Sequence, residues 1–280
     1  DSSQHSGIVV YNCTIMPNAE MGDPEYQKTY GLDMVEIPIF QAHSDEKEDD
    51  IVESETIVVG TKTMSRRQWI KTFKYSWTIQ CMHMLGLLQA VAIFFRYQFG
   101  IEYSEFYQKL IFYNTTHSTT INKELGMLDN LLRDVLKGKG FDQYVPGFER
   151  ISWPSEEASF LRISNKINTF YGEIKKFIRK EFPSLKGQKD MINELVDYQK
   201  YLIVKYNNNN DILKTKYDFH NYFVQCRSGI LSGLEEGNYI NKLAETKDYK
   251  GDKELFSREI VWYGRKGGKF FNPIDVRKDK

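Results

Sequence analysis

Cysteine is scarce in this sequence, and the three that are present, Cys13, Cys81 and Cys226, lie far apart. Their odd number and the lack of any Cys-x-x-Cys pair argue against a secreted disulfide scaffold. Net charge is absent too, because 38 basic residues balance 38 acidic ones, so no overall field favours nucleic acid or an anionic membrane surface. These absences predict a cytoplasmic protein that does not bind nucleic acid.

The first residues, Asp1 to Gly7, lack a start methionine, a basic segment and an apolar segment. They do not resemble a signal peptide, and we expect them to be an internal stretch of a longer polypeptide. A long membrane-spanning run is missing as well. The nineteen residues from Trp77 to Phe95 carry no formal charge, but four polar side chains interrupt them. We therefore expect a buried central helix and no membrane span.

Aromatic residues, at 14%, are plentiful, and 41% of the 280 residues are hydrophobic, which is enough for a sizeable core. Apolar residues recur mainly at helical spacing, with short β-branched runs near both ends. The sequence predicts a mostly α fold with short β segments, of the α+β class. Three parts are expected: residues 1–62, a helical domain at 63–206, and a small β-containing unit at 207–280.

Helix signals are clearest in the middle of the chain. Ser65 and Gln68 form a capping-box pattern that opens an apolar periodic stretch. Ser155 is a good N-cap residue, and Pro183 ends the apolar stripe that follows it. Five helices are predicted, at 65–97, 104–113, 120–138, 155–183 and 189–206.

Strand signals are shorter, and an acidic run separates two of them. From Asp45 to Glu55, seven of eleven residues are acidic, which is typical of a solvated loop. Residues 141–152 predict a loop with a possible strand, since they are aromatic, Gly/Pro-punctuated and non-periodic. Six strands are predicted, at 8–11, 34–40, 57–59, 217–223, 238–240 and 260–264.

Four stretches taken in order resemble one known family. They are Gln4–Ile8 with Tyr11–Met21, Asp23–Tyr26 and Tyr30–Gly31; Thr63–Ser65 with Trp69 and Ser76–His83; Trp153–Leu161; and Arg258–Gly268. Together they are similar to the region that follows the radical S-adenosylmethionine (SAM) core in cobalamin-binding radical SAM proteins. The resemblance extends over nearly the whole chain.

The resemblance implies a place within a larger protein. In that family a Rossmann-like cobalamin domain comes first, a partial (β/α) barrel with a [4Fe–4S] cluster comes next, and a largely helical extension closes the chain. By analogy, residues 1–62 would end the barrel, with 8–11 as its last strand. The loop of residues 12–21 would then lie at the barrel mouth, where active sites are found.

The same analogy suggests functional residues in that loop. Contacts to SAM would come from Asn12, Ile15, Met16 and Pro17, and contacts to a small-molecule substrate from Asn18 and Glu20. Each has an ordinary alternative, because Asn and Pro are common in turns and apolar side chains are common in cores. Cys13 is expected to be a small buried hydrophobe rather than a reactive thiol.

The chain also departs from the family pattern. A radical SAM cluster needs Cys-x-x-x-Cys-x-x-Cys, and no two cysteines here are close enough. The Asp-x-His-x-x-Gly pattern that ligates cobalt is missing as well. We therefore expect this piece to bind no cofactor alone, with SAM, the cluster and cobalamin held by the N-terminal domains of the same polypeptide.

Other candidate residues have simpler explanations. His83 is expected to be a core histidine rather than a metal ligand, and Glu156 and Glu157 fit the positive end of a helix dipole better than a proton-transfer pair. Residues 264–269 predict a basic hairpin turn. Two functions are therefore expected as alternatives. The first is the C-terminal accessory part of a cobalamin-dependent radical SAM enzyme, a class that includes methyltransferases. The second is a free-standing helical protein-interaction module.

Overall fold

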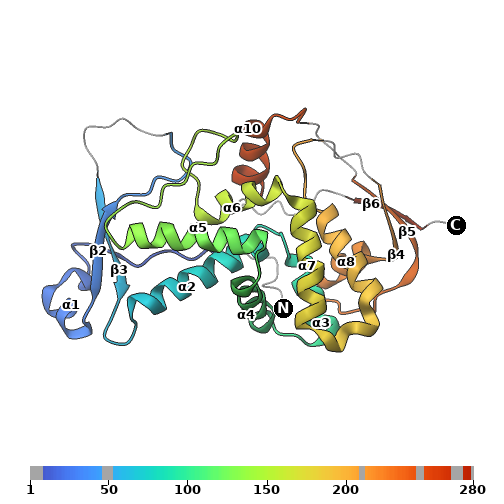
Figure 1. Ribbon diagram of the computed structural model, residues 1–280, viewed down its shortest axis with the longest axis horizontal. Coiled ribbons are helices and arrows are strands. Elements are labelled where there is room, and N and C mark those ends of the chain that lie inside the picture. The colour runs from blue at the N-terminus through green and yellow to red at the C-terminus, as the bar shows by residue number, and fades with distance from the viewer. Residues whose placement is uncertain (1–8, 46–52, 208–211, 244–248, 266–273, 279–280) are drawn as a thin grey trace.

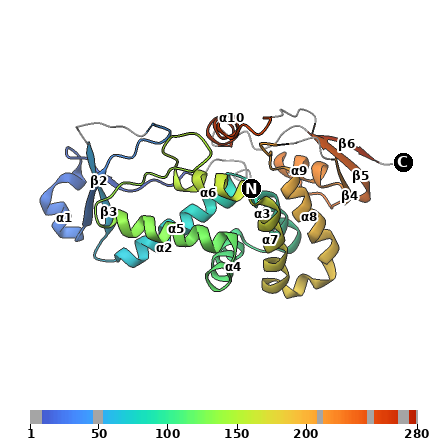
Figure 2. The same cartoon turned by 45° about the horizontal axis from the view of Figure 1, so that its top comes forward.

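A computed structural model describes residues 9–45, 53–207, 212–243, 249–265 and 274–278. Helices form the middle of the molecule, and two small antiparallel sheets lie at its two ends (Figures 1 and 2). This arrangement is consistent with the predicted α+β class. No closed barrel occurs in the described ranges.

The N-terminal sheet contains β1 (Thr14–Ile15), β2 (Asp33–Pro38) and β3 (Ser54–Gly60) in the order β1-β3-β2. Its inner strand β3 buries its last four residues, because both of its edges are paired. Between β1 and β2 the chain forms a short 3-10 helix, η2 (Glu20–Gly22), and α1 (Pro24–Tyr30), which Asp23 caps. The predicted strands at 34–40 and 57–59 are therefore confirmed.

The strand predicted at 8–11 is wrong for the residues that can be described. Residues 9–13 have no regular structure, and the strand lies later, at Thr14–Ile15, inside the predicted loop. The backbone N–H of Val10 donates instead to Oε1 of Gln80 at 3.2 Å. Antiparallel pairing of β1 with β3 also differs from the parallel pairing of a (β/α) barrel.

The predicted capping box is confirmed at the start of α2 (Arg66–Thr78), with Ser65 and Gln68 bonded reciprocally. The continuous helix predicted up to Tyr97 is wrong. After α2 the chain forms a π-helix, η3 (Ile79–Met84), then a turn, and then α3 (Gln89–Phe99), which is bent by 91° from the first segment.

Side chains from two other helices hold this bend. Gln199 accepts a hydrogen bond from the Ala90 N–H at 2.7 Å and donates to the Gly86 carbonyl at 2.9 Å, while Tyr171 donates to the Leu87 carbonyl at 2.8 Å. Gly86 has a φ of 81°, which suits glycine. Tertiary contacts that local periodicity cannot reveal therefore stabilise the break.

No single helix in the described ranges is both long and apolar enough to cross a bilayer. The two helical segments on either side of the bend pass such a test only when taken together. Residues 89–95 of α3 are buried within the protein. The expected burial of this apolar stretch is thus confirmed.

The remaining helices of the middle region follow in chain order and pack on α2, η3, α3 and one another. They are α4 (Tyr103–Thr116), α5 (Thr120–Val135), α6 (Ser155–Ser164), α7 (Ile167–Glu181), a 3-10 turn η4 (Pro183–Gln188) and α8 (Lys189–Tyr201). The single helix predicted at 155–183 is split, because Lys166 has non-helical dihedrals between α6 and α7. Ser155 is the first residue of α6, with Pro154 at the cap.

The C-terminal part mixes short helices with a second sheet. Its elements are β4 (Ile212–Tyr217), α9 (Phe219–Arg227), β5 (Glu236–Leu243), α10 (Lys253–Phe256), a π-helix η5 (Ser257–Arg265) and β6 (Ile274–Lys278). The strand order is β4-β5-β6. The strand predicted at 238–240 lies in β5 and is confirmed.

Two predicted strands in this part are helices instead. Residues 219–223 belong to α9, because Asp218 caps the Asn221 N–H at 3.0 Å and three aromatic side chains of the helix are buried. Residues 260–264 belong to η5, and Val261 is fully buried. Most of the predicted basic turn, residues 266–269, lies outside the described ranges.

One continuous hydrophobic core extends from Ile37 of β2 to Val261 of η5. Among its fully buried side chains are Trp77, Trp153, Phe94 and Phe170. The core joins the middle helices to elements on both sides of them. The three-part division of the chain remains a prediction.

Candidate functional site

The six residues predicted to contact SAM or substrate lie together on one loop around η2. Asn12 and Ile15 are partly buried, whereas Met16, Pro17, Asn18 and Glu20 are exposed. The backbone turns here through bonds from the Ala19 N–H to the Met16 carbonyl at 3.0 Å and from the Gly22 N–H to the Ala19 carbonyl at 2.8 Å. The residues therefore lie close together along one short segment, with Ile15 in β1 and Glu20 in η2, and their functional roles remain predictions.

Close backbone packing fixes the shape of this loop. A Cβ atom at Gly22 would lie only 2.5 Å from the carbonyl oxygen of Pro17, so no larger residue fits without movement of the backbone. Gln27 of α1 also donates to the Met21 carbonyl at 3.0 Å. The loop is thus a defined structure on the surface of the sheet.

The expectation that Cys13 is buried is wrong, because its side chain is exposed on this loop. Its sulfur lies 4.0 Å from the sulfur of Met21. The other two thiols, of Cys81 in η3 and Cys226 in α9, are buried, and Cys81 has no exposed surface. Burial raises the pKa of Cys81 well above its usual value, and the negative charges of Glu124 and Glu156 add to the effect.

His83 is a core histidine, as predicted. It is 6% exposed, and its Nδ1 lies 2.9 Å from the hydroxyl oxygen of Tyr107. The ring also meets Tyr103 and Tyr107 edge-on. Within the described ranges, no group of three or more His, Cys, Asp or Glu side chains could hold a metal ion.

The first turn of α6 departs most from the sequence-based expectation. Glu156 is 8% exposed and Glu157 is fully buried, so neither is simply a solvated carboxylate at a helix start. A buried carboxylate needs a partner, and Oε2 of Glu157 lies 2.7 Å from Nε2 of His43. The imidazole is stacked on Trp262 at 4.4 Å and meets Trp153 edge-on at 5.3 Å.

His43 also has an unusual backbone conformation, with a φ of 62°. A non-glycine residue in this region carries some strain, which the surrounding contacts must offset. Sequence reasoning missed His43, because its partner is 114 residues away and no local motif connects them. The residues around His43 contain no other sequence motif that would predict a functional site.

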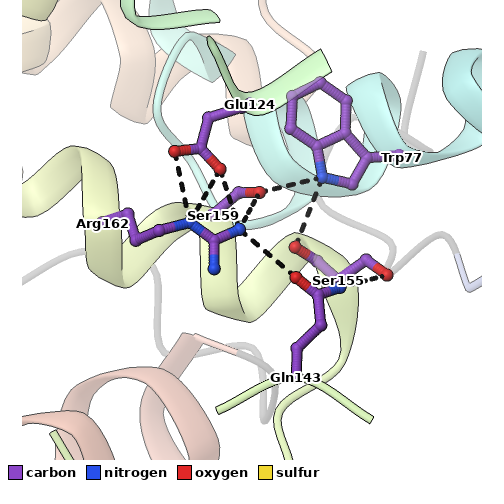
Figure 3. Close-up of polar contacts among 6 residues, drawn as sticks. All are labelled: Trp77, Glu124, Gln143, Ser155, Ser159 and Arg162. Atoms are coloured by element: carbon purple, nitrogen blue, oxygen red, sulfur yellow. Dashed lines mark hydrogen bonds and ion pairs between the residues drawn. The ribbon is translucent and has the colours of Figure 1, made fainter. Parts of the chain in front are cut away.

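A second buried polar network also involves α6 (Figure 3). Arg162 of α6 forms an ion pair with Glu124 of α5, with Nη2 and Oε2 2.8 Å apart, and its Nε donates to the same carboxylate at 2.9 Å. Nη2 also contacts Ser159 and Gln143, at 3.2 and 3.4 Å. The side chains of Arg162 and Glu124 are only 19% and 6% exposed.

The network also connects α6 to α2. The indole N–H of Trp77 donates to Oγ of Ser159 at 3.2 Å and to the Ser155 carbonyl at 3.3 Å, and Gln143 donates to Oγ of Ser155 at 2.9 Å. These partners satisfy one another, as Figure 3 shows. The network therefore joins three helices and a loop, which is a structural role.

The structure also contains a surface depression of ≈ 710 Å³. Its lining comes from three separate segments: Asp45, the loop at 144–150 and Glu254 of α10. Asp45 is two residues from His43. The depression was not expected from the sequence, which predicted a loop with a possible strand at 141–152.

No family model matches the chain. Among curated proteins, it is 24% identical over 192 residues to the cobalamin-dependent radical SAM methyltransferase TokK of Streptomyces tokunonensis. It is also 24% identical over 200 residues to 2-(S-pantetheinyl)-carbapenam-3-carboxylate methyltransferase of Streptantibioticus cattleyicolor. Each match covers 64% of this chain but 28% of the relative. The chain is thus a distant relative of part of these methyltransferases and spans less than a third of their length.

Proposed function

We propose that this chain is the C-terminal, substrate-shaping part of a cobalamin-dependent radical SAM enzyme. The observation that carries the proposal is the unequal coverage of the matches, 64% of this chain against 28% of each relative. Such a ratio is expected when one portion of a longer enzyme is compared with the whole. The names of the relatives favour methyl transfer as the reaction.

The residues described here do not fit a metal cofactor. They include no His, Cys, Asp or Glu cluster that could hold a metal ion, and the thiol of Cys13 is exposed whereas that of Cys81 is buried. In this proposal the iron–sulfur cluster, SAM and cobalamin belong to the upstream domains. This chain contributes binding surface and exclusion of water.

The loop at 12–22 is the part proposed to meet SAM and the small-molecule substrate. Its polar side chains Asn12, Asn18 and Glu20 have accessible surface, and close packing at Gly22 fixes the backbone that carries them. Val9, Val10 and Tyr11, just before the loop, are 42%, 47% and 84% exposed. Contact with a preceding barrel strand would cover these apolar side chains.

The test uses the complete reading frame that contains this chain. We expect it to encode a Cys-x-x-x-Cys-x-x-Cys motif upstream of Asp1, and the purified anaerobic protein to cleave SAM. Asn12→Ala and Glu20→Ala should each lower turnover by about tenfold, equivalent to about 1.4 kcal/mol of transition-state binding. Glu25→Ala, on the exposed first turn of α1, is the matched control and should leave turnover unchanged.

Two results would contradict the proposal. A reading frame with no cysteine motif ahead of this chain would remove its catalytic core and would favour the free-standing helical interaction module. Wild-type turnover in both loop variants would refute the role assigned to Asn12 and Glu20.

A further inference from the structure

The depression lined by Asp45, residues 144–150 and Glu254 has both apolar and charged walls. Tyr144, Val145, Pro146 and Phe148 supply apolar surface, and Asp45, Glu149, Arg150 and Glu254 supply charge. Phe148 is buried at 2% exposure, whereas Tyr144 is 42% exposed, so one aromatic ring anchors the wall and the other faces outward. A site that combines apolar walls with a few polar groups is typical of small-molecule binding.

Contacts to the interior hold the walls in place. Asp45 and Ile151 form an isolated antiparallel bridge, and the His43 N–H donates to the Ser152 carbonyl at 2.7 Å. The buried Glu157 carboxylate holds the His43 ring at 2.7 Å. The wall that carries Asp45 is therefore fastened both to the 151–152 segment and to α6.

Several charged side chains in and around the depression already interact with other groups of the protein. Glu149 forms an ion pair with Arg258 at 2.8 Å. The ammonium of Lys253 lies over the rings of Phe148 and Tyr206, at 5.5 and 5.1 Å from their centroids. These groups contribute to the walls rather than to ligand binding.

Three charged side chains of the lining remain available. Within the described part of the chain, Arg150, Asp45 and Glu254 have neither an ion pair nor a side-chain hydrogen bond. One cation and two carboxylates thus line the same depression without neutralising one another. A purely anionic ligand would be repelled by the two carboxylates, and a purely cationic one by Arg150 and Lys253.

We propose that the depression binds a small zwitterionic molecule of the α-amino-acid type. Its carboxylate would pair with Arg150, its ammonium group with both Asp45 and Glu254, and its apolar side chain would pack on Tyr144. Guanidinium groups bind carboxylates through paired hydrogen bonds, which gives the orientation its specificity. The site goes beyond the proposed enzyme function and does not depend on the upstream domains.

Calorimetric titration of the full-length polypeptide with three matched probes tests this inference. L-Phenylalanine is the zwitterion, phenylalaninamide lacks the carboxylate, and N-acetylphenylalanine lacks the ammonium group. We expect L-phenylalanine to bind with a Kd of about 1 mM and each of the other probes to bind about tenfold more weakly. Arg150→Gln and Asp45→Asn should each weaken binding of L-phenylalanine by about tenfold.

The control is Arg96→Gln, which removes a partly exposed cation of α3 that pairs with Glu102 and should not change the Kd. Equal binding of all three probes would show unspecific contact with the aromatic wall and would overturn the proposal. So would the absence of binding to wild-type protein that SAM cleavage or its circular dichroism spectrum shows to be folded. Either result leaves the proposed enzyme function intact.

Discussion

Among single residues, burial decides which polar side chains matter most for stability. Glu124 and Arg162 are 6% and 19% exposed, whereas the ion-paired side chains of Asp33 and Arg66 are 41% and 45% exposed. Water screens the Asp33–Arg66 ion pair, so that this pair contributes little net stability although its geometry is as good as that of Glu124–Arg162. The first pair cannot be separated without leaving a charge inside the protein.

Replacing Arg162 alone should therefore be costly. We expect Arg162→Met to lower the free energy of unfolding by about 3 kcal/mol, because the Glu124 carboxylate loses its counter-ion. Urea denaturation measures this loss. The double variant with Glu124→Leu should recover most of it, and the exposed control Arg66→Met should cost less than about 1 kcal/mol. Equal effects of Arg162→Met and Arg66→Met would refute the assignment.

Thiol reactivity should follow exposure in the same way. Cys13 is exposed, whereas burial raises the pKa of Cys81 and, to a smaller degree, that of Cys226. Only the thiolate reacts, so we expect Ellman's reagent at pH 8 to modify Cys13 rapidly and the other two only after unfolding. Cys13→Ser should abolish the fast phase. A fast phase that persists in Cys13→Ser would show that Cys81 or Cys226 is accessible.

Among the elements, the break between α2 and α3 is the feature that most shapes the fold. The pattern of apolar residues does not distinguish a helix that continues from one that is broken by a bend. Periodicity alone therefore favoured one long helix. The 91° bend arises because Gly86 can adopt a positive φ and because Gln199 and Tyr171 satisfy the freed backbone groups. Those partners come from α8 and α7.

Loss of the Gln199 side chain should weaken this bend. Gln199→Leu keeps the volume but removes two buried hydrogen bonds, to Gly86 and Ala90, and should cost about 2 kcal/mol of unfolding free energy. Thermal and urea denaturation report the change. Gln188→Leu, at the exposed start of α8, is the control and should be neutral. A neutral Gln199→Leu would mean that packing alone holds the bend.

For the whole molecule, the buried tyrosines predict sensitivity to alkali. Burial raises the pKa of Tyr107 and Tyr198 above the usual value of about 10, and that of Tyr249 to about 12. The folded protein then retains protons that the unfolded chain releases. The stability from these groups is present below about pH 10 and is lost as the pH rises further.

The urea midpoint should accordingly fall between pH 8 and pH 11. Tyr198→Phe should reduce this fall, because it removes one buried phenol, whereas Tyr11→Phe should leave it unchanged, since Tyr11 is 84% exposed. Lysine titration contributes equally to both variants and cancels in the comparison. Identical pH profiles for the two variants would contradict the prediction.

The sequence by itself determined the mostly helical class, the capping box at Ser65, β2, β3 and β5, and the resemblance to radical SAM proteins. These features depend on local patterns of a few residues, so they can be read without knowledge of the fold. It also grouped residues 12–21 as one segment, because those residues are neighbours in the chain.

Only the tertiary structure decided the bend at Gly86, the helical state of 219–223 and 260–264, and the burial of Glu157 against His43. Each depends on partners from distant parts of the chain, such as Gln199 for the bend and Trp262 for His43. A short aromatic or β-branched run fits a strand or a helix equally well until the core that covers it is known. Burial against distant parts of the chain therefore decided between helix and strand where the local sequence pattern fitted both.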